Sequence, residues 1–219
     1  MNNQPVKIAL TDDHILLRNA LASMLDNTGE CKVVIQANNG QDLIQTLKSG
    51  QQLDIVILDL NMPIMDGHET AIRLHKEFPD LKVLMLTMYD SDLALIRLLQ
   101  AGVRGFMKKD IHPQEMLAAI RSVMETGYFY SAQTGSKLAG LFREIHDKNA
   151  LYHKIMLSDQ EVAFLKLACT EMTYKEIAEK MNLNPRAVDG IRDDLFHRLD
   201  IKSRVGLVMY SIKHGLVTI

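Results

Sequence analysis

Five polar residues of this chain have the types needed to bind a metal ion and to take up a phosphoryl group. They are Asp12, Asp13, Asp59, Thr87 and Lys109, and each ends or closely follows a short apolar run. Three carboxylates brought together repel one another, and a hard cation such as Mg²⁺ relieves that repulsion. A cation held by the three aspartates would align a phosphoryl group for attack by an oxygen of Asp59, since aspartate is an accepted nucleophile for acyl phosphates.

The two remaining residues would hold the group that is transferred. Lys109 offers a positive charge and Thr87 a hydroxyl, and both stabilise phosphoryl oxygens. Phosphatases of the haloacid dehalogenase type also use a strand-end aspartate and Mg²⁺, but they need a second acid two residues later. That position is Asn61 here, and an amide cannot act as a general acid or base. We therefore expect a persistent phosphoaspartate on a protein that is not an enzyme and that removes the group only slowly.

These residues need structural elements that deliver them to one place. Short β-rich runs at 6–10, 32–37, 54–60, 82–87 and 103–108 alternate with helical patterns such as 15–27, 92–102 and 112–127. Several of the runs are apolar without alternation, as in parallel strands covered on both faces. The alternation predicts an α/β fold with an open, doubly wound sheet of five parallel strands. Such sheets bind ligands beyond the carboxyl ends of their strands, where the five polar residues stand.

The strand pattern stops near residue 155 and helical signals replace it. Ser158 followed by Glu161 forms a capping box, and further helical segments occupy 173–181, 185–199 and 203–215. Asn184 and Pro185 suit the N-cap and the first position of a helix that follows a very short turn, so two of these helices read as a helix-turn-helix. We predict three parts: an α/β domain at 1–128, a linker at 129–156 in which a helix is possible, and a smaller all-α four-helix domain at 157–219.

Composition sets wider bounds on the function. Hydrophobic residues make up 47% of the chain and charged residues 24%, as in a soluble globular protein. The net charge of −2 is nearly neutral, so the charge of the whole chain gives no signal for nucleic acid or acidic lipid. The two cysteines, Cys31 and Cys169, belong to no metal-binding cluster. No apolar stretch approaches the ~20 residues needed to span a bilayer, so we expect a cytoplasmic protein without a membrane partner.

Residues 6–127 resemble the receiver domain of two-component response regulators, which has a flavodoxin-like fold. The matching pieces are TDDH (11–14), LDLNMPIMDG (58–67), LMLTM (84–88) and AGVRGFMKKD (101–110). The resemblance implies that a sensor histidine kinase phosphorylates Asp59. It also implies that Asp12 and Asp13 bind Mg²⁺ together with Asp59 and the backbone carbonyl of Asn61.

The same resemblance assigns roles to residues around the acceptor. Lys109, and not Lys108, falls in the position of the family's lysine. Phe106 would be the aromatic residue that moves as Thr87 swings toward the phosphate, although it could equally be a simple core residue. His14 would lie in the first turn of a helix and would not be a metal ligand.

Residues 157–217 resemble the LuxR-type (NarL/FixJ-type) DNA-binding domain, notably in KEIAEKM, NPRAV and LDIKSR. We expect DNA contacts from five basic residues: Lys175, Arg186, Arg192, Lys202 and Arg204. Arg186 is the best candidate for reading a base.

The chain departs from the LuxR-type pattern after Val188. The family shows a lysine, a small polar residue and a histidine at the next positions, and this chain has Asp189, Gly190 and Ile191. Asp189 can accept a hydrogen bond from a cytosine amino group but cannot pair with a phosphate.

Together the two resemblances imply a phosphorylation-dependent, DNA-binding transcription regulator that dimerises when it is phosphorylated. The last helix carries an apolar stripe suited to a dimer face. The alternative is a receiver protein whose helical domain acts through protein–protein interaction, with acidic residues in place of DNA-facing ones.

Overall fold

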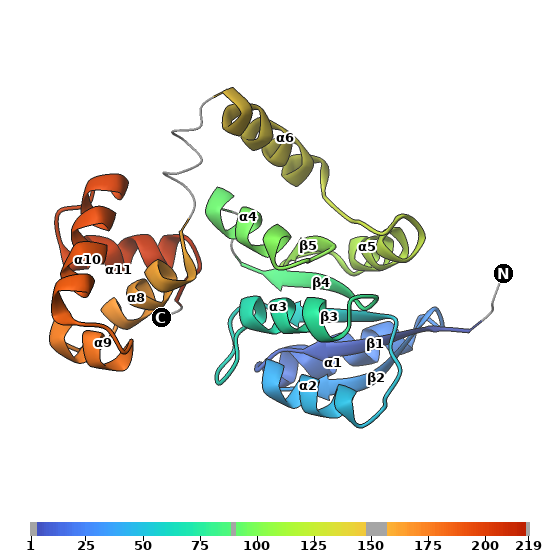
Figure 1. Cartoon of the computed structure of the whole chain (residues 1–219). Coiled ribbons are helices and arrows are strands. Elements are labelled where there is room, and N and C mark those ends of the chain that lie inside the picture. The colour runs from blue at the N-terminus through green and yellow to red at the C-terminus, as the bar shows by residue number, and fades with distance from the viewer. Residues whose placement is uncertain (1–3, 89–90, 148–156, 218–219) are drawn as a thin grey trace. The chain divides into compact units, whose positions relative to one another are not determined.

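The computed structural model of the chain describes residues 4–88, 91–147 and 157–217. It divides into two compact units, the first comprising residues 1–88 and 95–136 and the second residues 89–94 and 137–219. Figure 1 shows the elements of both. Among the described residues, no helix combines the length and the apolar character required to cross a bilayer.

The first unit is built on a five-stranded parallel sheet, as the alternating pattern predicted. The strands are β1 (Val6–Thr11), β2 (Cys31–Ala37), β3 (Ile55–Asp59), β4 (Lys82–Thr87) and β5 (Gly105–Lys108). Their order across the sheet is β2-β1-β3-β4-β5, so the chain changes direction of travel once, beside β1. All five residues of β3 are buried, which explains why its first four residues are apolar without alternation.

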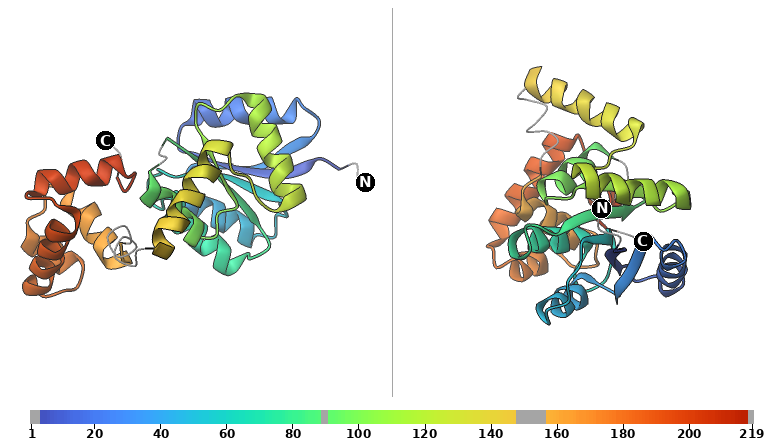
Figure 2. Two further views of the ribbon diagram at one scale, coloured as in Figure 1. Left: turned by 90° about the horizontal axis from the view of Figure 1, so that it is seen from above. Right: turned by 90° about the vertical axis from the view of Figure 1, so that its right-hand side faces the viewer.

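Helices cover both faces of the sheet. They are α1 (Ile15–Asp26), α2 (Gly40–Lys48), α3 (Gly67–Glu77), α4 (Asp92–Gln100) and α5 (Pro113–Thr126). One buried cluster joins α1 and α5 to alternate strand residues such as Ile8, Ile57 and Leu86. Figure 2 shows α1 and α5 on one face and α2 and α3 on the other, which fixes the flavodoxin-like architecture.

The fifth strand is shorter than the sequence predicted, because α4 ends in a turn that uses the residues before it. Gly102 has φ +83°, a left-handed conformation that favours glycine, and the backbone N–H of Val103 donates to the carbonyl of Leu98 at 3.2 Å. Val103 therefore closes the helix. The backbone N–H of Arg104 already donates to the carbonyl of Val83 on β4 at 2.8 Å, and β5 itself begins at Gly105.

The predicted linker at 129–156 carries more structure than a plain connection. Phe129 forms a parallel bridge with Gly105, and its backbone N–H donates to the carbonyl of Arg104 at 3.0 Å. Tyr130 packs against the ring of Phe106, with ring centroids 5.7 Å apart. Helix α6 (Ala132–Asp147) follows, in the part of the linker where a helix was possible. Residues 148–156 of the predicted linker lie outside the described residues.

The second unit contains the four predicted helices, α8 (Asp159–Ala168), α9 (Tyr174–Lys180), α10 (Pro185–Leu199) and α11 (Arg204–Lys213). Their buried residues include Phe164, Ile177, Val188 and Leu195, all fully enclosed. The capping box at Ser158 and Glu161 is confirmed, and so are the Asn184 cap and the first-position Pro185.

Candidate functional site

Strand register brings the predicted acidic residues to one rim. Thr11 of β1 pairs with Leu58 of β3, so Asp12 and Asp59 stand next to each other at the carboxyl ends of the two strands. On the other side of β3, Asp59 pairs with Leu86, which places Thr87 one position beyond it. The backbone N–H of Lys109 donates to the carbonyl of Thr87 at 3.1 Å. The sheet thus delivers four separate segments to a single edge.

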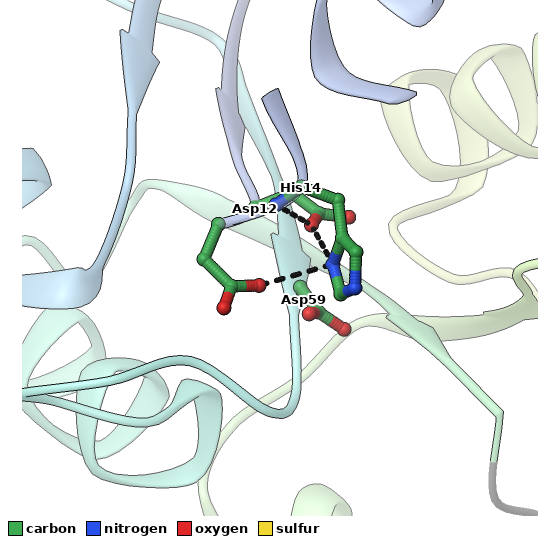
Figure 3. Close-up of side chains that lie close together, drawn as sticks. Asp12, His14 and Asp59 are labelled. Atoms are coloured by element: carbon green, nitrogen blue, oxygen red, sulfur yellow. Dashed lines mark hydrogen bonds and ion pairs between the residues drawn. The ribbon is translucent and has the colours of Figure 1, made fainter. Parts of the chain in front are cut away.

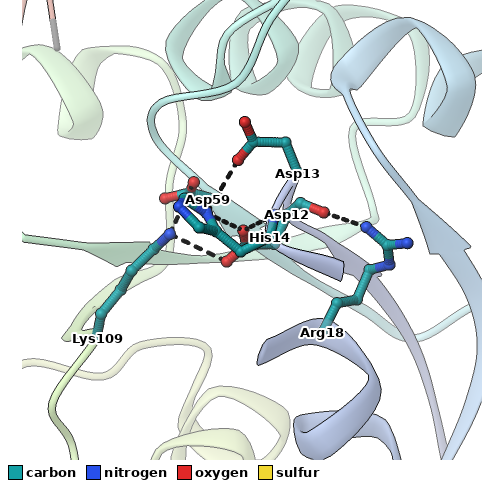
Figure 4. Close-up of polar contacts among 6 residues, drawn as sticks. All are labelled: Asp12, Asp13, His14, Arg18, Asp59 and Lys109. Atoms are coloured by element: carbon teal, nitrogen blue, oxygen red, sulfur yellow. Dashed lines mark hydrogen bonds and ion pairs between the residues drawn. The ribbon is translucent and has the colours of Figure 1, made fainter. Parts of the chain in front are cut away.

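The lysine lies between two of the acids. Lys109 Nζ is 3.0 Å from Asp12 Oδ2 and 2.9 Å from Asp59 Oδ2, as Figure 4 shows. The side chains of the two acids are only 5% and 2% exposed, and that of the lysine is 13% exposed. Apart from this ammonium group, neither of the two carboxylate oxygens has a hydrogen-bond donor among the described residues. The site therefore holds two buried anions and one cation.

Burial shifts the protonation equilibrium of the central acid. Loss of solvent raises the pKa of Asp59 to about 6, against the opposing pull of Lys109 and of a hydrogen bond from the backbone of Asn61. The nearby charge of Asp12 pushes the pKa in the same direction as burial. Burial alone would lower the pKa of Lys109, but its contacts with Asp59 and Asp12 outweigh this effect and raise the pKa. A second cation near Asp59 would therefore stabilise the ionised form of this carboxylate.

His14 is the residue that sequence reasoning placed least well. It is the N-cap of α1 and does not lie within the first helical turn. Its Nδ1 lies 2.9 Å from Asp12 Oδ1, and Figure 3 shows the ring facing Asp12. The same nitrogen lies 3.0 Å from Asp13 Oδ1, a contact that Figure 4 draws. Ligand atoms of Asp12, Asp13, His14 and Asp59, here called the acidic cluster, lie within 4.8 Å of one another. The adjacency of His14 to Asp13 in the sequence was the signal for it.

The acidic cluster could hold a metal ion. Oxygen atoms of three carboxylates gather from two strand ends, and two of these oxygens meet no donor besides Lys109 among the described residues. Hard cations such as Mg²⁺ prefer such oxygen ligands. Arg18, which donates to the backbone carbonyl of Asp12, fixes the loop that carries the first two acids (Figure 4).

Gly67 allows the loop after β3 to lie close against the end of that strand. The backbone N–H of Gly67 donates to the carbonyl of Leu60 at 2.8 Å. A Cβ atom at this position would lie 2.2 Å from the backbone oxygen of Asp59, so only glycine allows the approach. Asn61, predicted to contribute its carbonyl to the metal, lies in this loop and is partly buried.

The two residues predicted to form the switch lie on neighbouring strands. Thr87 ends β4 and is 2% exposed, and Phe106 on β5 is 5% exposed. The register pairs Thr87 with Lys108 and Met85 with Phe106. Both are enclosed in the structure, and the aromatic contact of Phe106 is the ring of Tyr130.

The predicted DNA-binding residues fall into two groups. Lys175 on α9, Arg186 on the first turn of α10 and Lys202 before α11 are exposed. Arg192 and Arg204 instead have partners within the second unit. Arg204 donates from Nε to the carbonyl of Ala168 at 2.9 Å and from a terminal nitrogen to that of Thr170 at 2.7 Å. It therefore closes the carboxyl end of α8 and is less available to a phosphate.

Arg192 is held by its neighbours on α10. Its guanidinium group lies 2.7 Å from Asp189 Oδ1 and 2.8 Å from Asp193 Oδ1. The same group lies over the ring of Tyr174, 5.1 Å from the ring centroid. Asp189, Arg192 and Asp193 are called the α10 triad below. Sequence reasoning named Arg192 as a DNA contact and missed this pairing, although acids three residues before it and directly after it were the signal.

Known protein families match both the first and the second unit of the chain. The family model described as "Response regulator receiver domain" matches residues 8–121, which include the whole acidic cluster and Lys109. The model described as "Bacterial regulatory proteins, luxR family" matches residues 156–211, which include α8, α9 and α10.

Curated relatives match the chain along nearly its full length. "Response regulator GacA" of Pseudomonas syringae pv. syringae is 31% identical over 97% of this chain and 98% of its own. "Response regulator UvrY" of Escherichia coli K12 is 28% identical over 96% and 95%. Among solved structures, RcsB from Salmonella enterica bound to a promoter with the phosphomimetic BeF3⁻ has 22% identity and a TM-score of 0.67, covering 94% of this chain and 97% of its own.

Proposed function

This chain belongs to the response regulators and carries a LuxR-type DNA-binding domain behind its receiver domain, and we propose that phosphorylation of Asp59 controls its binding to DNA. The observation that carries the proposal is the pair of contacts from Lys109 to Asp12 and Asp59 on one rim of the sheet. In this proposal Asp59 is the acceptor carboxylate, Asp12 binds the metal, and Lys109 is a cation within reach of the same phosphoryl group.

The reaction needs few groups, and the chain supplies all but the metal and the donor. The residues that would hold Mg²⁺ are Asp12, Asp13, Asp59 and, through its backbone carbonyl, Asn61. The bound ion would neutralise the phosphoryl oxygens and align the phosphorus with the acceptor oxygen. An oxygen of Asp59 forms the new bond to phosphorus as the bond to the donor's leaving group breaks. Lys109 and the hydroxyl of Thr87 hold the transferred oxygens.

The product should persist. The position two residues after the acceptor is Asn61, which cannot move a proton for hydrolysis. We propose that the protein is a signal carrier and not a phosphatase, with only slow loss of the phosphoryl group.

Mass spectrometry tests the acceptor directly. Incubation of the full chain with acetyl phosphate and Mg²⁺ should add one phosphoryl group, and Asp59→Ala should abolish the addition. Asp80→Ala, which removes an exposed acid of the same unit, is the matched control and should be modified like the unaltered protein. An adduct that survives Asp59→Ala would refute the assignment.

The partners follow from the same proposal. A sensor histidine kinase would supply the phosphoryl group, the phosphorylated chain would dimerise, and it would act on promoter DNA in the cytoplasm. The similar RcsB was solved bound to promoter DNA in the presence of a phosphomimetic, which supports this sequence of events. Fluorescence anisotropy with labelled duplex DNA should show affinity that falls steeply with salt and rises on phosphorylation.

The acidic residues on α10 support a second candidate function. Asp189, Asp193 and Asp194 lie on the helix that would enter the major groove, where negative charge opposes a polyanion. In this alternative the helical domain binds a protein. Absence of binding to any duplex at low salt, with and without phosphorylation, would favour it.

A further inference from the structure

We propose that Asp189 of α10 determines the DNA sequence that this protein prefers. Its carboxylate accepts a hydrogen bond from the exocyclic amino group of a base, which is cytosine by preference. Arg192 is the residue that positions the Asp189 side chain. This inference rests on the proposed DNA-binding function. It identifies a base reader at a place where the sequence departs from the LuxR-type pattern.

The position of Asp189 suits a base contact. It is the fifth residue of α10, the second helix of the helix-turn-helix, whose early residues lie nearest the base edges. Its side chain is 49% exposed, so it is open to a ligand. A carboxylate has only acceptors, and among the groups on the major-groove edges it is the cytosine amino group that pairs with Asp or Glu.

Arg192 fixes the carboxylate and uses only one of its oxygens. The ion pair runs to Oδ1 of Asp189, which leaves Oδ2 as an acceptor. Asp193 and the ring of Tyr174 hold the guanidinium group from two other sides, and only 23% of the arginine side chain is exposed. These contacts direct the guanidinium group of Arg192 toward its own helix and Tyr174, and they give Asp189 a defined orientation.

Gly190 provides an independent observation. Glycine destabilises a helix interior relative to alanine, and residue 190 lies in the middle of α10. An added Cβ would meet no atom within 4 Å, so packing inside the protein does not require glycine here. A bare backbone beside Asp189 instead lets the helix come close to a surface outside the chain.

Selection from random duplex DNA tests the proposal on the full chain, followed by anisotropy with the selected duplex. Asp189→Asn should change the preferred base at one position of each half-site from cytosine toward adenine, which an amide reads with both of its polar atoms. Discrimination for the original base should fall roughly tenfold or more. Arg192→Ala should loosen preference at the same position.

Asp194→Asn is the matched control, since it removes one exposed negative charge from the same helix outside the α10 triad. Both asparagine variants should strengthen non-specific binding alike, but the control should keep the original preference. Gly190→Ala should raise the melting temperature and weaken binding to the selected duplex.

Two negative outcomes are distinguishable. An unchanged base preference in Asp189→Asn overturns this inference and leaves the proposed function standing. Failure of every form, including the unaltered phosphorylated chain, to bind any duplex at low salt overturns the proposed DNA-binding function and this inference with it.

Discussion

The acidic cluster and the α10 triad hold the same kinds of charge in opposite surroundings. Asp12 and Asp59 are 5% and 2% exposed and share one lysine, whereas Asp189 and Asp193 are 49% and 64% exposed and share one arginine. Burial raises the pKa of Asp59 to about 6. Burial therefore lets Asp12 and Asp59 affect the pKa and the stability of the fold strongly. The exposed acids of the α10 triad contribute little to stability and mainly fix side-chain orientation.

The largest expected effect comes from removing the buried cation. Lys109→Ala leaves Asp12 and Asp59 without their ion pair, and loss of one partner of a buried pair costs about 3 kcal/mol. Calorimetric unfolding of the metal-free chain at pH 7.5 should show this loss in the receiver transition. Lys108→Ala, which removes the exposed lysine that ends β5, should cost much less. Equal effects of the two variants would contradict the role of Lys109.

The next effect has the opposite sign. The pKa of Asp59 lies above its ordinary value of 3.8, so the folded form binds the proton more tightly than the unfolded chain. Ionised Asp59 therefore destabilises the metal-free fold fully above pH 6 or so, and this destabilisation disappears as the pH falls toward 4. Asp59→Asn should raise stability at pH 7.5 by about 2 to 3 kcal/mol, the free-energy equivalent of a shift that already includes the opposing contact with Lys109.

Calorimetry at pH 7.5 and 4.5 in the presence of a chelator checks the sign. The gain of Asp59→Asn over the unaltered chain should shrink at the lower pH, and added Mg²⁺ should stabilise the unaltered chain more than the variant. A variant that is less stable at pH 7.5 would contradict the burial argument.

A half-buried ion pair in the second unit should rank third. Glu161 caps α8 by accepting from the backbone N–H of Ser158 at 2.6 Å, and it also pairs with Arg198 of α10. Glu176 caps α9 in the same way, through Thr173. Glu176→Ala removes only a capping contact, whereas Glu161→Ala removes a cap and the contact with Arg198, so Glu161→Ala should destabilise the second unit more. Equal losses by calorimetry would mean that the Arg198 contact contributes nothing.

The smallest effect is expected in the α10 triad. Exposed ion pairs contribute at most ~1 kcal/mol, and the contact of Arg192 with Tyr174 adds a comparable amount at best. Arg192→Ala should therefore lower the stability of the second unit by about 1 kcal/mol or less in calorimetry. A loss as large as that of Lys109→Ala would remove the contrast between the two groups of charges.

The fold of the first unit and the gathering of its acidic residues at one edge were predictable because one pattern encodes both. An apolar run such as residues 55–58 has the length of a buried parallel strand and is too short for a helix. Asp59 follows directly after this run. Once the strands are parallel, their carboxyl ends meet at one edge. The doubly wound sheet and the four-helix unit are confirmed by the structure, and the receiver and LuxR-type resemblances by the family models.

What the sequence did not reveal depends on side-chain direction. The ring of His14 turns toward Asp12 and Asp13 because the N-cap backbone points it there, and no spacing rule states this. Arg204 contacts Ala168 and Thr170, more than thirty residues away, through packing of α11 against α8. Basic residues near a recognition helix look alike in a sequence, and only tertiary contacts separate the engaged from the exposed.

The bridge between Gly105 and Phe129 has a consequence for any attempt to isolate the receiver. Strand β5 is the outermost strand of the sheet, and the residues after α5 cover part of its rim. A fragment ending at Thr126 would uncover that rim and the ring of Phe106, inviting self-association through edge pairing. A monodisperse fragment should therefore extend at least through Ser131.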